Sequence, residues 1–557
     1  MSFDPAPYRP NPSNWFLSKA KHQGWGVAQF GDPDGRLEGT VEIDIDDRGT
    51  LIIEMVVETL ESNETFELGP LQFLAYKKQT TEDGRITLTP RPDGFNPCNE
   101  LTVTTNEGVF QSTDCMVVSV NVVFGRTNEP LRVSFHAPQA HFDANTSETP
   151  LYWVLPLQNF LSDAFDTHPT LDRHPLRVYP TPEIPANVPE EHARWARWIA
   201  NAQNSLIVFE FDDQLAFIER LPDYPLHRER LLSRQVQTAT TAVMVGPIGD
   251  HPIDPESVYT WLPIDLLPVL GLATGQEVSA PWAELRSARG TLVRRIHRHI
   301  GIPIFSRGRG AMDEGFYNGT GALLTAALKS RWFGTDLLRA TLKQVIRAGF
   351  VSATLEDRLV HCFRAIEGLS KALTSRESKR PEDVLPPEYW KHVQRILRSA
   401  SRDIRSLARE ANQRGMDETA NTLELIADRV PELRNVEPGL GRRLKELLHL
   451  YELPDAMILE KHYKQNRRAH KKEWISALSF YRGMTLHEGF IDFDSDKTDP
   501  GEVWEISVHL HDVLMRIILK MLGYDGLYHP AMATDSRMEP LDWVTPEMSA
   551  TALGYRA

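Results

Sequence analysis

The sequence predicts an α+β protein of several domains, with a β-rich N-terminal part, a mixed middle region and a purely helical C-terminal part. Three observations carry this prediction. Apolar residues alternate with a period of two in the first 150 residues, and they recur with a helical period in the last third. The chain has 557 residues, which is more than one hydrophobic core accommodates.

The N-terminal region, residues 1–160, shows the pattern of short antiparallel strands. Val41–Ile45 alternates apolar and acidic residues, Asp46–Gly49 supplies a turn, and Leu51–Val57 resumes the apolar run. Further strand-like segments follow at Val117–Phe124 and Leu131–His136. Strands of this length and spacing favour an antiparallel sandwich or a barrel, and we expect a sandwich-like domain.

A proline-rich stretch separates this region from the next. Residues 161–190 include prolines at positions 169, 175, 180, 182, 185 and 189. Proline removes backbone donors and restricts its neighbours, so we expect an extended connector there, followed by a mixed α/β region over residues 191–345. Within that region, Leu206–Phe211 and Leu215–Ile218 predict a hairpin.

Residues 346–530 predict a helical domain, and residues 531–557 an aperiodic C-terminal tail. Apolar residues recur at helical spacing from Leu355 to Leu373, and again from Val503 to Met521 over about five turns. Pro500 and Glu502 are typical of a helix start, and Gly523 is typical of a helix end.

Composition excludes several classes of protein. The content of 41% hydrophobic and 25% charged residues is that of a globular protein. Three cysteines are too few and too scattered for a disulfide framework or a zinc site, and no apolar run approaches the ~20 residues that span a bilayer. The first residues lack the features of a signal peptide. We therefore expect a cytoplasmic protein with no membrane partner, no metal and no cofactor.

The charge is unevenly distributed along the chain. The net charge is −15, which argues against non-specific coating of nucleic acid. Residues 1–150 carry 11 Lys and Arg against 22 Asp and Glu, whereas residues 375–480 carry 21 against 17. The acidic N-terminal part and the locally basic C-terminal part are therefore expected to bind different partners.

Five arginines spaced three and four residues apart predict a basic ridge on one helix. At 100° per residue they fall within an arc of about 80°. They are Arg395, Arg398, Arg402, Arg405 and Arg409. Apolar residues fall on the opposite side, which predicts that this side lies in a core: Ile396, Leu397, Ala400, Ile404, Leu407 and Ala411. Guanidinium groups pair with phosphate geometrically, so the ridge is a candidate RNA-binding surface. A solvated face, or an interface with the acidic N-terminal region, is the alternative.

A second basic cluster lies ten to twenty residues before Arg482. We assign four of its residues to RNA binding: Lys464, Arg467, Arg468 and Lys471. A solubilising helix face is the alternative for this cluster. The two clusters together favour a nucleic-acid surface.

Arg482 and His487 form the candidate catalytic pair. An arginine can hold a phosphate with two hydrogen bonds, and a histidine can move a proton near neutral pH. Arg294 and His299 have the same spacing, so the surroundings must distinguish the two pairs. Only the first pair follows a basic cluster, precedes a long amphipathic helix and has a glycine, Gly489, that permits a tight turn close to a ligand.

Three segments of the C-terminal third carry a family resemblance. Phe363–Leu369 (FRAIEGL) is similar to an opening helix, Arg482 to His487 matches an Arg-x4-6-His motif, and Val503–Leu522 matches a closing helix. Together they resemble the HEPN ribonuclease domain of ApeA-like anti-phage proteins of bacteria, over roughly residues 350–525. The family commonly has Asn or another polar residue after the arginine, where this chain has Gly483.

The resemblance implies a helical bundle that dimerises so that two Arg/His pairs face one cleft and cleave RNA without a metal. His487 would act as general base on a ribose 2′-hydroxyl or as acid to the leaving 5′-oxygen, and Arg482 would stabilise the charge on the phosphorane. Glu367 would orient either residue; a buried salt-bridge partner is its alternative role. The products would be a 2′,3′-cyclic phosphate and a 5′-hydroxyl.

The expected function is therefore that of an abortive-infection endoribonuclease. It would cut RNA, with tRNA as one candidate, once the N-terminal region detects a phage-derived trigger, which we expect to be a protein. Two alternatives remain open: a catalytically inactive HEPN dimerisation scaffold with a ligand- or protein-binding β domain, and a sugar- or peptide-binding sandwich fused to a helical oligomeriser. The carboxylates between Asp492 and Asp496 would explain cleavage that is lost on chelation.

Overall fold

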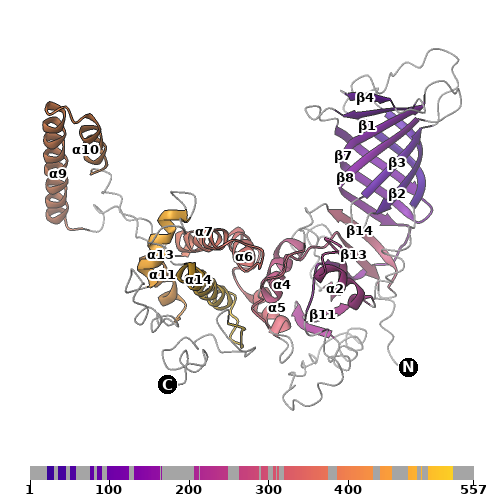
Figure 1. Cartoon of the computed structure of the whole chain (residues 1–557). Coiled ribbons are helices and arrows are strands. Elements are labelled where there is room, and N and C mark those ends of the chain that lie inside the picture. Colours follow the sequence, from indigo (N-terminus) through magenta and orange to yellow (C-terminus); the bar gives the residue numbers. More distant parts are fainter. Residues whose placement is uncertain are drawn as a thin grey trace. The chain divides into compact units, whose positions relative to one another are not determined.

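A computed structural model gives the fold of the chain (Figure 1). It describes residues 22–30, 36–45, 51–57, 76–80, 85–90, 97–123, 131–162, 165, 206–211, 214–221, 223–248, 262–287, 290–298, 305–308, 310–312, 319–373, 385–430, 440–453, 474–485, 491 and 500–530. These residues fall into two compact units, one of residues up to 354 together with 518–530, and one of residues 355–517. The α+β class predicted from the sequence is confirmed.

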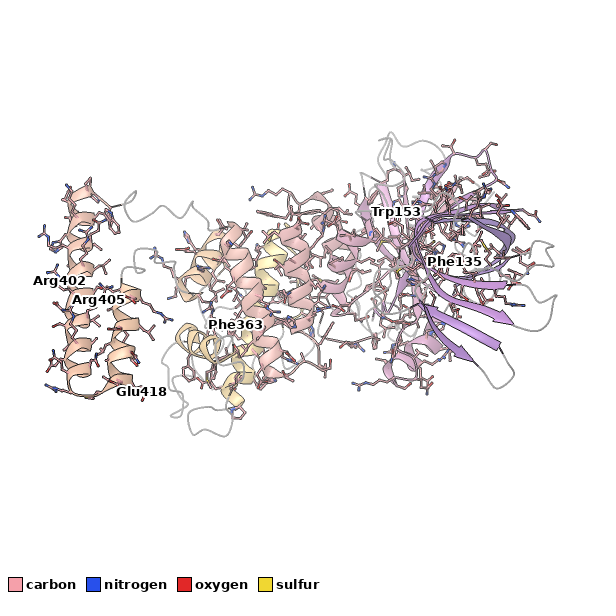
Figure 2. All side chains as sticks on the ribbon, turned by 90° about the horizontal axis from the view of Figure 1, so that it is seen from above. Phe135, Trp153, Phe363, Arg402, Arg405 and Glu418 are labelled. Atoms are coloured by element: carbon pink, nitrogen blue, oxygen red, sulfur yellow. The ribbon has the colours of Figure 1, made fainter. Side chains whose placement is uncertain are left out.

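Six antiparallel strands of the first unit close into a ring. They are β1 (His22–Phe30), β2 (Arg36–Ile45), β3 (Leu51–Val57), β6 (Pro97–Thr105), β7 (Gly108–Val123) and β8 (Leu131–Ala144). The pairing runs β8–β3–β2–β1–β6–β7, and β7 then pairs with β8. Each strand contributes side chains to a single apolar cluster that includes Val41, Ile53 and Phe135. Phe135 is labelled in Figure 2.

The two long strands make closure possible, because each changes neighbour along its length. One edge of β7 pairs with β6 over its first half and with β5 (Arg85–Pro90) over its second. One edge of β8 pairs with β3 at residues 131–137 and with β14 (Leu292–Arg298) at residues 139–143. The opposite edges of β7 and β8 pair with each other. The expected sandwich-like arrangement is corrected here: one sheet closes on itself, rather than two sheets packing face to face.

The same sheet continues beyond the ring on both sides. On one side β5 pairs with β4 (Tyr76–Thr80). On the other side the order after β14 is β13 (Trp282–Ser287), β9 (Pro150–Gln158), β12 (Thr240–Pro247), β11 (Gln214–Arg220) and β10 (Leu206–Phe211). The predicted hairpin around residues 212–213 is confirmed as β10–β11. The regions separated at residues 161–190 in the sequence therefore share one sheet, because β9 precedes the proline-rich stretch and its neighbours β12 and β13 follow it.

A buried carboxylate lies where β13 and β14 pair. Glu284 is fully buried, and its two oxygens accept hydrogen bonds from Arg286 at 2.8 Å and from Arg295 at 2.9 Å. Burial alone raises the pKa of Glu284, but the two guanidinium groups outweigh burial and hold that pKa below its ordinary value. The carboxylate is therefore ionised, and its two partners replace the water it loses.

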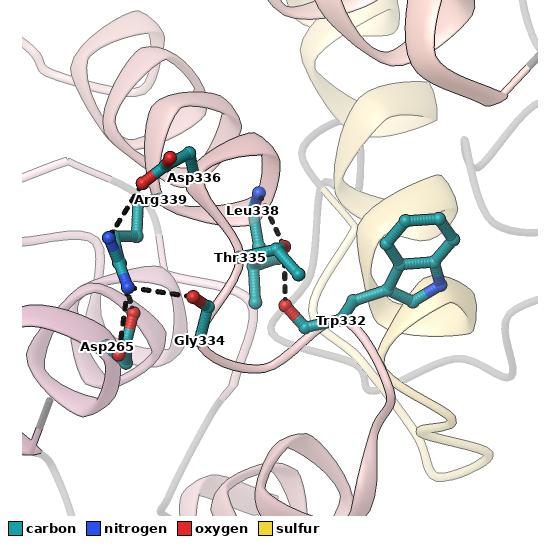
Figure 3. A network of polar contacts seen from close by, with 7 residues as sticks. All are labelled: Asp265, Trp332, Gly334, Thr335, Asp336, Leu338 and Arg339. Carbon is teal, nitrogen blue, oxygen red and sulfur yellow. Dashed lines mark hydrogen bonds and ion pairs between the residues drawn. The ribbon is translucent and has the colours of Figure 1, made fainter.

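The described helices of the first unit lie between or after the strands β10 to β14 in the sequence. They are α2 (Tyr224–Leu232), the π-helical turn η7 (Leu262–Leu266), α4 (Leu267–Thr274), α5 (Gly319–Lys329) and α6 (Asp336–Ala348). Figure 3 shows the polar contacts that connect η7 with α6. Arg339 pairs with the buried Asp265, and it also binds Asp336 at 2.8 Å and the carbonyl of Gly334 at 2.7 Å. Thr335 caps α6 by accepting a hydrogen bond from the Leu338 amide.

The second unit is helical. Its helices are α7 (Leu355–Leu373), α9 (Pro387–Gln413), α10 (Asp417–Arg429), α11 (Leu440–Leu450), α13 (Trp474–Gly483) and α14 (Pro500–Met521), of which residues 518–521 are grouped with the first unit. Helix α7 packs against α11 and α13, and α9 packs along α10. The predicted end of α14 is confirmed: Gly523 has φ of +77° and the Tyr524 amide donates to the Leu519 carbonyl. Among the helices that the structure describes, none has both the length and the apolarity needed to cross a bilayer.

Candidate active site

Arg482 and Glu367 are in direct contact. The last turn of α13 carries Arg482, whose Nε and Nη2 atoms donate to Oε1 of Glu367 on α7 at 2.8 and 2.5 Å. The two residues lie 115 positions apart in the sequence. Their side chains are 33% and 35% exposed, so the ion pair lies at the surface of the helical unit and remains accessible to a ligand. It is not the buried salt bridge that was the alternative for Glu367.

A second carboxylate fixes the residue before Arg482. Tyr481 is buried, and its hydroxyl donates to Oε2 of the buried Glu502 at 2.9 Å. Thr485 adds a hydrogen bond from its hydroxyl to the Tyr481 carbonyl at 2.9 Å. The sequence predicted that Glu502 lies in the first turn of a helix, and in the structure it lies near the start of α14. Its contact with Tyr481 was missed because nothing in the spacing of residues 481 and 502 signals it.

Gly483 has room for a side chain. Apart from the adjoining residues and the backbone of its own helix, no described atom lies within 4 Å of the position that a Cβ atom would take there. Packing within the described part of the chain therefore does not explain why this chain has glycine where the HEPN family commonly has a polar residue.

Several predicted site residues lie outside the described residues. They are His487, the basic residues Lys464, Arg467, Arg468 and Lys471, and the carboxylates from Asp492 to Asp496. Among the described residues, no group of three or more His, Cys, Asp or Glu side chains is placed to hold a metal ion.

Arg294 and His299, which have the same spacing as Arg482 and His487, lie in a different part of the chain. Arg294 lies on β14 in the first unit and forms an ion pair with Asp143 on the neighbouring strand β8. His299 lies outside the described residues. Arg294 thus serves a cross-strand contact.

Helix α14 contains buried charged and titratable groups. His509, Asp512 and Arg516 are at most 1% exposed, and the Nε atom of Arg516 lies 3.4 Å from Oδ2 of Asp512. Burial, with a further contribution from the charge of Arg516, lowers the pKa of His509 to about 3. His509 is therefore neutral near pH 7 and is not a proton donor to a substrate.

The arginine ridge is exposed, as predicted. All five residues lie on α9 with exposed side chains, and Figure 2 labels Arg402 and Arg405 among them. Arg405 is paired with Asp428 of α10 at 2.9 Å. Within the described part of the chain, the other four arginines (Arg395, Arg398, Arg402 and Arg409) have no ion pair or hydrogen bond to a side chain. Among the described residues, the ridge therefore has four guanidinium groups without a side-chain partner and one that is paired with Asp428.

The opposite side of α9 differs from the prediction. Ile396 and Leu407 were expected in a core, but they are 54% and 53% exposed. The buried residues of α9 are Trp390, Ser401, Ala408 and Ala411, of which Ala411 was predicted to be buried. Helix α9 packs against α10, where the Ser401 hydroxyl donates to the Ala427 carbonyl at 2.8 Å. The prediction was wrong because α9 has two adjacent apolar sectors, and only one of them faces α10.

Comparison of the chain with models of protein families, with curated proteins and with solved structures finds no match. A function for this chain is therefore inferred from its own residues and from the resemblance carried by its three C-terminal segments.

The depressed pKa of His509 predicts how stability depends on pH. The unfolded chain binds a proton at this histidine below pH 6.5, whereas the folded chain does so only near pH 3. The contribution of neutral His509 is therefore complete above pH 6.5 and is lost as the pH falls toward 3, by about 1.4 kcal/mol per pH unit. Urea unfolding of the helical unit between pH 6.5 and 4 should show this slope, and His509→Gln should remove it. The exposed His449 provides the control, since His449→Gln should leave the slope as it is. Equal slopes in wild type and His509→Gln would contradict the assignment.

Proposed function

We propose that the protein is a metal-independent endoribonuclease of the HEPN type that acts in bacterial defence against phage. The contact between Arg482 and Glu367 is the observation that carries the proposal. The two residues come from two of the three segments on which the HEPN resemblance depends, and 115 positions separate them in the sequence. A chance occurrence of the Arg-x4-His spacing would not account for this contact.

The geometry of Arg482 suits a phosphate-binding role. Glu367 occupies the edge of the guanidinium formed by Nε and Nη2. Among the described residues, Nη1 forms no hydrogen bond or ion pair with a side chain, and in this proposal it binds a phosphate oxygen. Glu367 therefore orients the guanidinium without taking all of its donors.

The proposed reaction needs one proton acceptor, one proton donor and a cation. The ribose 2′-hydroxyl loses its proton and its oxygen attacks the adjacent phosphorus. The bond from phosphorus to the 5′-oxygen breaks, and that oxygen takes up a proton. His487 acts as the general base in the first transfer or as the acid in the second, and Arg482 stabilises the charge that develops on the phosphoryl oxygens. The products are a 2′,3′-cyclic phosphate and a 5′-hydroxyl.

The other parts of the molecule take the roles that the sequence suggested. The four available arginines of α9 would bind the RNA backbone together with the basic cluster at residues 464–471, and tRNA is one candidate substrate. The acidic β-rich region would detect a phage-derived trigger, a protein, and the chain would act in the cytoplasm as a homodimer or a larger homo-oligomer.

One observation favours a second candidate function. Gly483 replaces the polar residue that commonly follows the family's arginine, although a side chain would fit there among the described atoms. The alternative is therefore a HEPN-type dimerisation scaffold that has lost activity, with a ring of strands that binds a ligand or a protein.

The central prediction concerns metal independence and the catalytic pair. Purified protein should cleave RNA in the presence of EDTA, because neither the base nor the cation is a metal. Arg482→Ala and His487→Ala should each lower the rate by at least about 100-fold, the scale typical of a lost general base or oxyanion contact. The Arg294→Ala variant is the matched control and should cleave at the wild-type rate. Cleavage that is lost on chelation, or that survives both substitutions, would contradict this site.

Glu367 should affect the rate far more than the stability. Because the ion pair is about one-third exposed on each side, its loss should cost less than about 1 kcal/mol of unfolding free energy. Glu367→Gln frees the guanidinium and should lower the cleavage rate about 10-fold or more. The control is Glu446→Gln, which breaks the exposed ion pair with Arg442 on α11 and should change neither quantity. An unchanged rate in Glu367→Gln would exclude an orienting role.

The ridge should contribute to the salt dependence of RNA binding. The test uses a His487→Ala background, in which the RNA is bound but not cleaved. There the double substitution Arg398→Gln and Arg402→Gln should reduce the magnitude of the slope of log affinity against log salt by about 1.4 to 1.8, because two phosphate contacts are lost. Arg405→Gln should have a smaller effect than Arg402→Gln, since Arg405 is already paired with Asp428. An unchanged slope in the double variant would remove the ridge from the RNA surface.

A further inference from the structure

The hairpin of α9 and α10 buries its small side chains and exposes its large apolar ones. The seam between the two helices consists largely of Ser401, Ala408, Ala411, Ala420 and Ala427. Tyr389, Ile396 and Leu407 of α9 are 63%, 54% and 53% exposed, and Ile426 of α10 is 47% exposed. The hairpin therefore buries little apolar area by itself, and the residues that would stabilise it most on burial are in contact with solvent.

These four exposed residues form one face, whereas Leu425, which is 65% exposed, lies about 100° away from Ile426 around α10. At 100° per residue, Tyr389, Ile396 and Leu407 fall within an arc of about 20°, roughly 150° from the centre of the arginine ridge. Their spacings of seven and eleven residues are those of a heptad seam, offset by one residue from the seam that faces α10. Ile426 projects on the same side of the hairpin, because α10 runs antiparallel to α9 and Ser401 lies level with Ala427. We call this surface, formed by residues 389, 396, 407 and 426, the apolar face.

We propose that the apolar face is the interface through which two copies of this chain associate, so that two hairpins close a four-helix bundle. A twofold axis parallel to the helices brings α9 of each copy against α10 of the other in an antiparallel arrangement. Each of the four helices then buries two adjacent seams, one within its own hairpin and one between copies. The arginine ridges remain on the outside of the bundle.

The dimensions of the face suit a weak self-association. From Tyr389 to Ala411, α9 extends about 33 Å. Helix α10 has 13 residues and lies beside α9 over about 20 Å, where two helices about 9 Å apart present a width of about 18 Å. The face therefore offers about 500 Å² on each copy and about 1,000 Å² in total, which is the size of a weak specific interface.

Charge selects a second copy in this particular orientation. Asp403 borders the apolar face on α9 and Arg429 borders it on α10, both exposed. Neither has an ion pair within the described part of the chain. Packing α9 against α10 of the other copy places Asp403 near the level of the second copy's Arg429, on both sides of the axis. Packing α9 against α9 would instead bring acidic borders together, because Glu410 lies beside Asp403 on that edge.

The first test measures the mass of the full-length protein by sedimentation at several concentrations, which is independent of RNA cleavage. Ile396→Asp with Leu407→Asp should weaken the association at least about 10-fold, so that the variant has half the wild-type mass at concentrations where wild type is associated. Ser399→Asp with Ser406→Asp is the matched control, since it adds the same charge to exposed positions of the same helix away from the face. The control should have the wild-type mass, and circular dichroism should be the same for all three proteins.

The second test is specific to a second copy. Asp403→Arg and Arg429→Asp should each weaken the association about 5-fold or more, and the two substitutions combined in one chain should restore it to within about 2-fold of wild type. A wild-type protein that is monomeric at all concentrations, or an apolar-face variant with unchanged mass, would overturn the proposal and assign the face to another segment of the chain or to a different protein. A double charge reversal no stronger than the single ones would overturn the antiparallel arrangement.

Discussion

Two adjacent residues at the end of α13 connect three helices, and the geometry of the candidate site depends on that connection. Tyr481 hydrogen-bonds the buried Glu502 at the start of α14, and Arg482 forms an ion pair with Glu367 in α7. The first contact is buried and exchanges water for one well-placed hydrogen bond, so it fixes the last turn of α13. The second is partly exposed and contributes little stability. Its consequence is that Glu367 fixes the orientation of the Arg482 guanidinium through Nε and Nη2.

In the first unit the comparable constraint is the pairing of β7 with β8, and it shows what a sequence can and cannot predict about the fold. The hairpins β2–β3 and β10–β11 follow from local alternation and short turns, and both were predictable. Closure of the ring was not, because it requires β7 and β8 to change neighbours half-way along their lengths. The burial of Glu284 between two arginines was equally unpredictable, since an isolated Glu in a strand is usually solvated.

For the helical unit, the sequence predicted the residues better than their contacts. Arg482 and Glu367 were both identified as candidates, and the family resemblance implied that Glu367 orients either Arg482 or His487. No spacing rule by itself joins residues 115 positions apart. The arginine ridge on α9 was predicted correctly because 100° periodicity places charges reliably on a solvent-facing arc. The buried side was wrong for Ile396 and Leu407, since periodicity shows that a sector is apolar without showing which partner covers it. In α9 the sector of small residues packs against α10, whereas the sector of large apolar residues is exposed.

The central claim is that Arg482 and His487 cleave RNA by internal attack of the 2′-oxygen, with no metal. The most direct measurement is mass spectrometry of the fragments that the purified protein produces from a short RNA in EDTA, compared with an RNA in which each ribose lacks its 2′-hydroxyl. Attack by the 2′-oxygen should give fragments that end in a 2′,3′-cyclic phosphate and begin with a 5′-hydroxyl, and the 2′-deoxy substrate should not be cleaved. Fragments with a 5′-phosphate and a 3′-hydroxyl, or cleavage of the deoxy substrate, would contradict it.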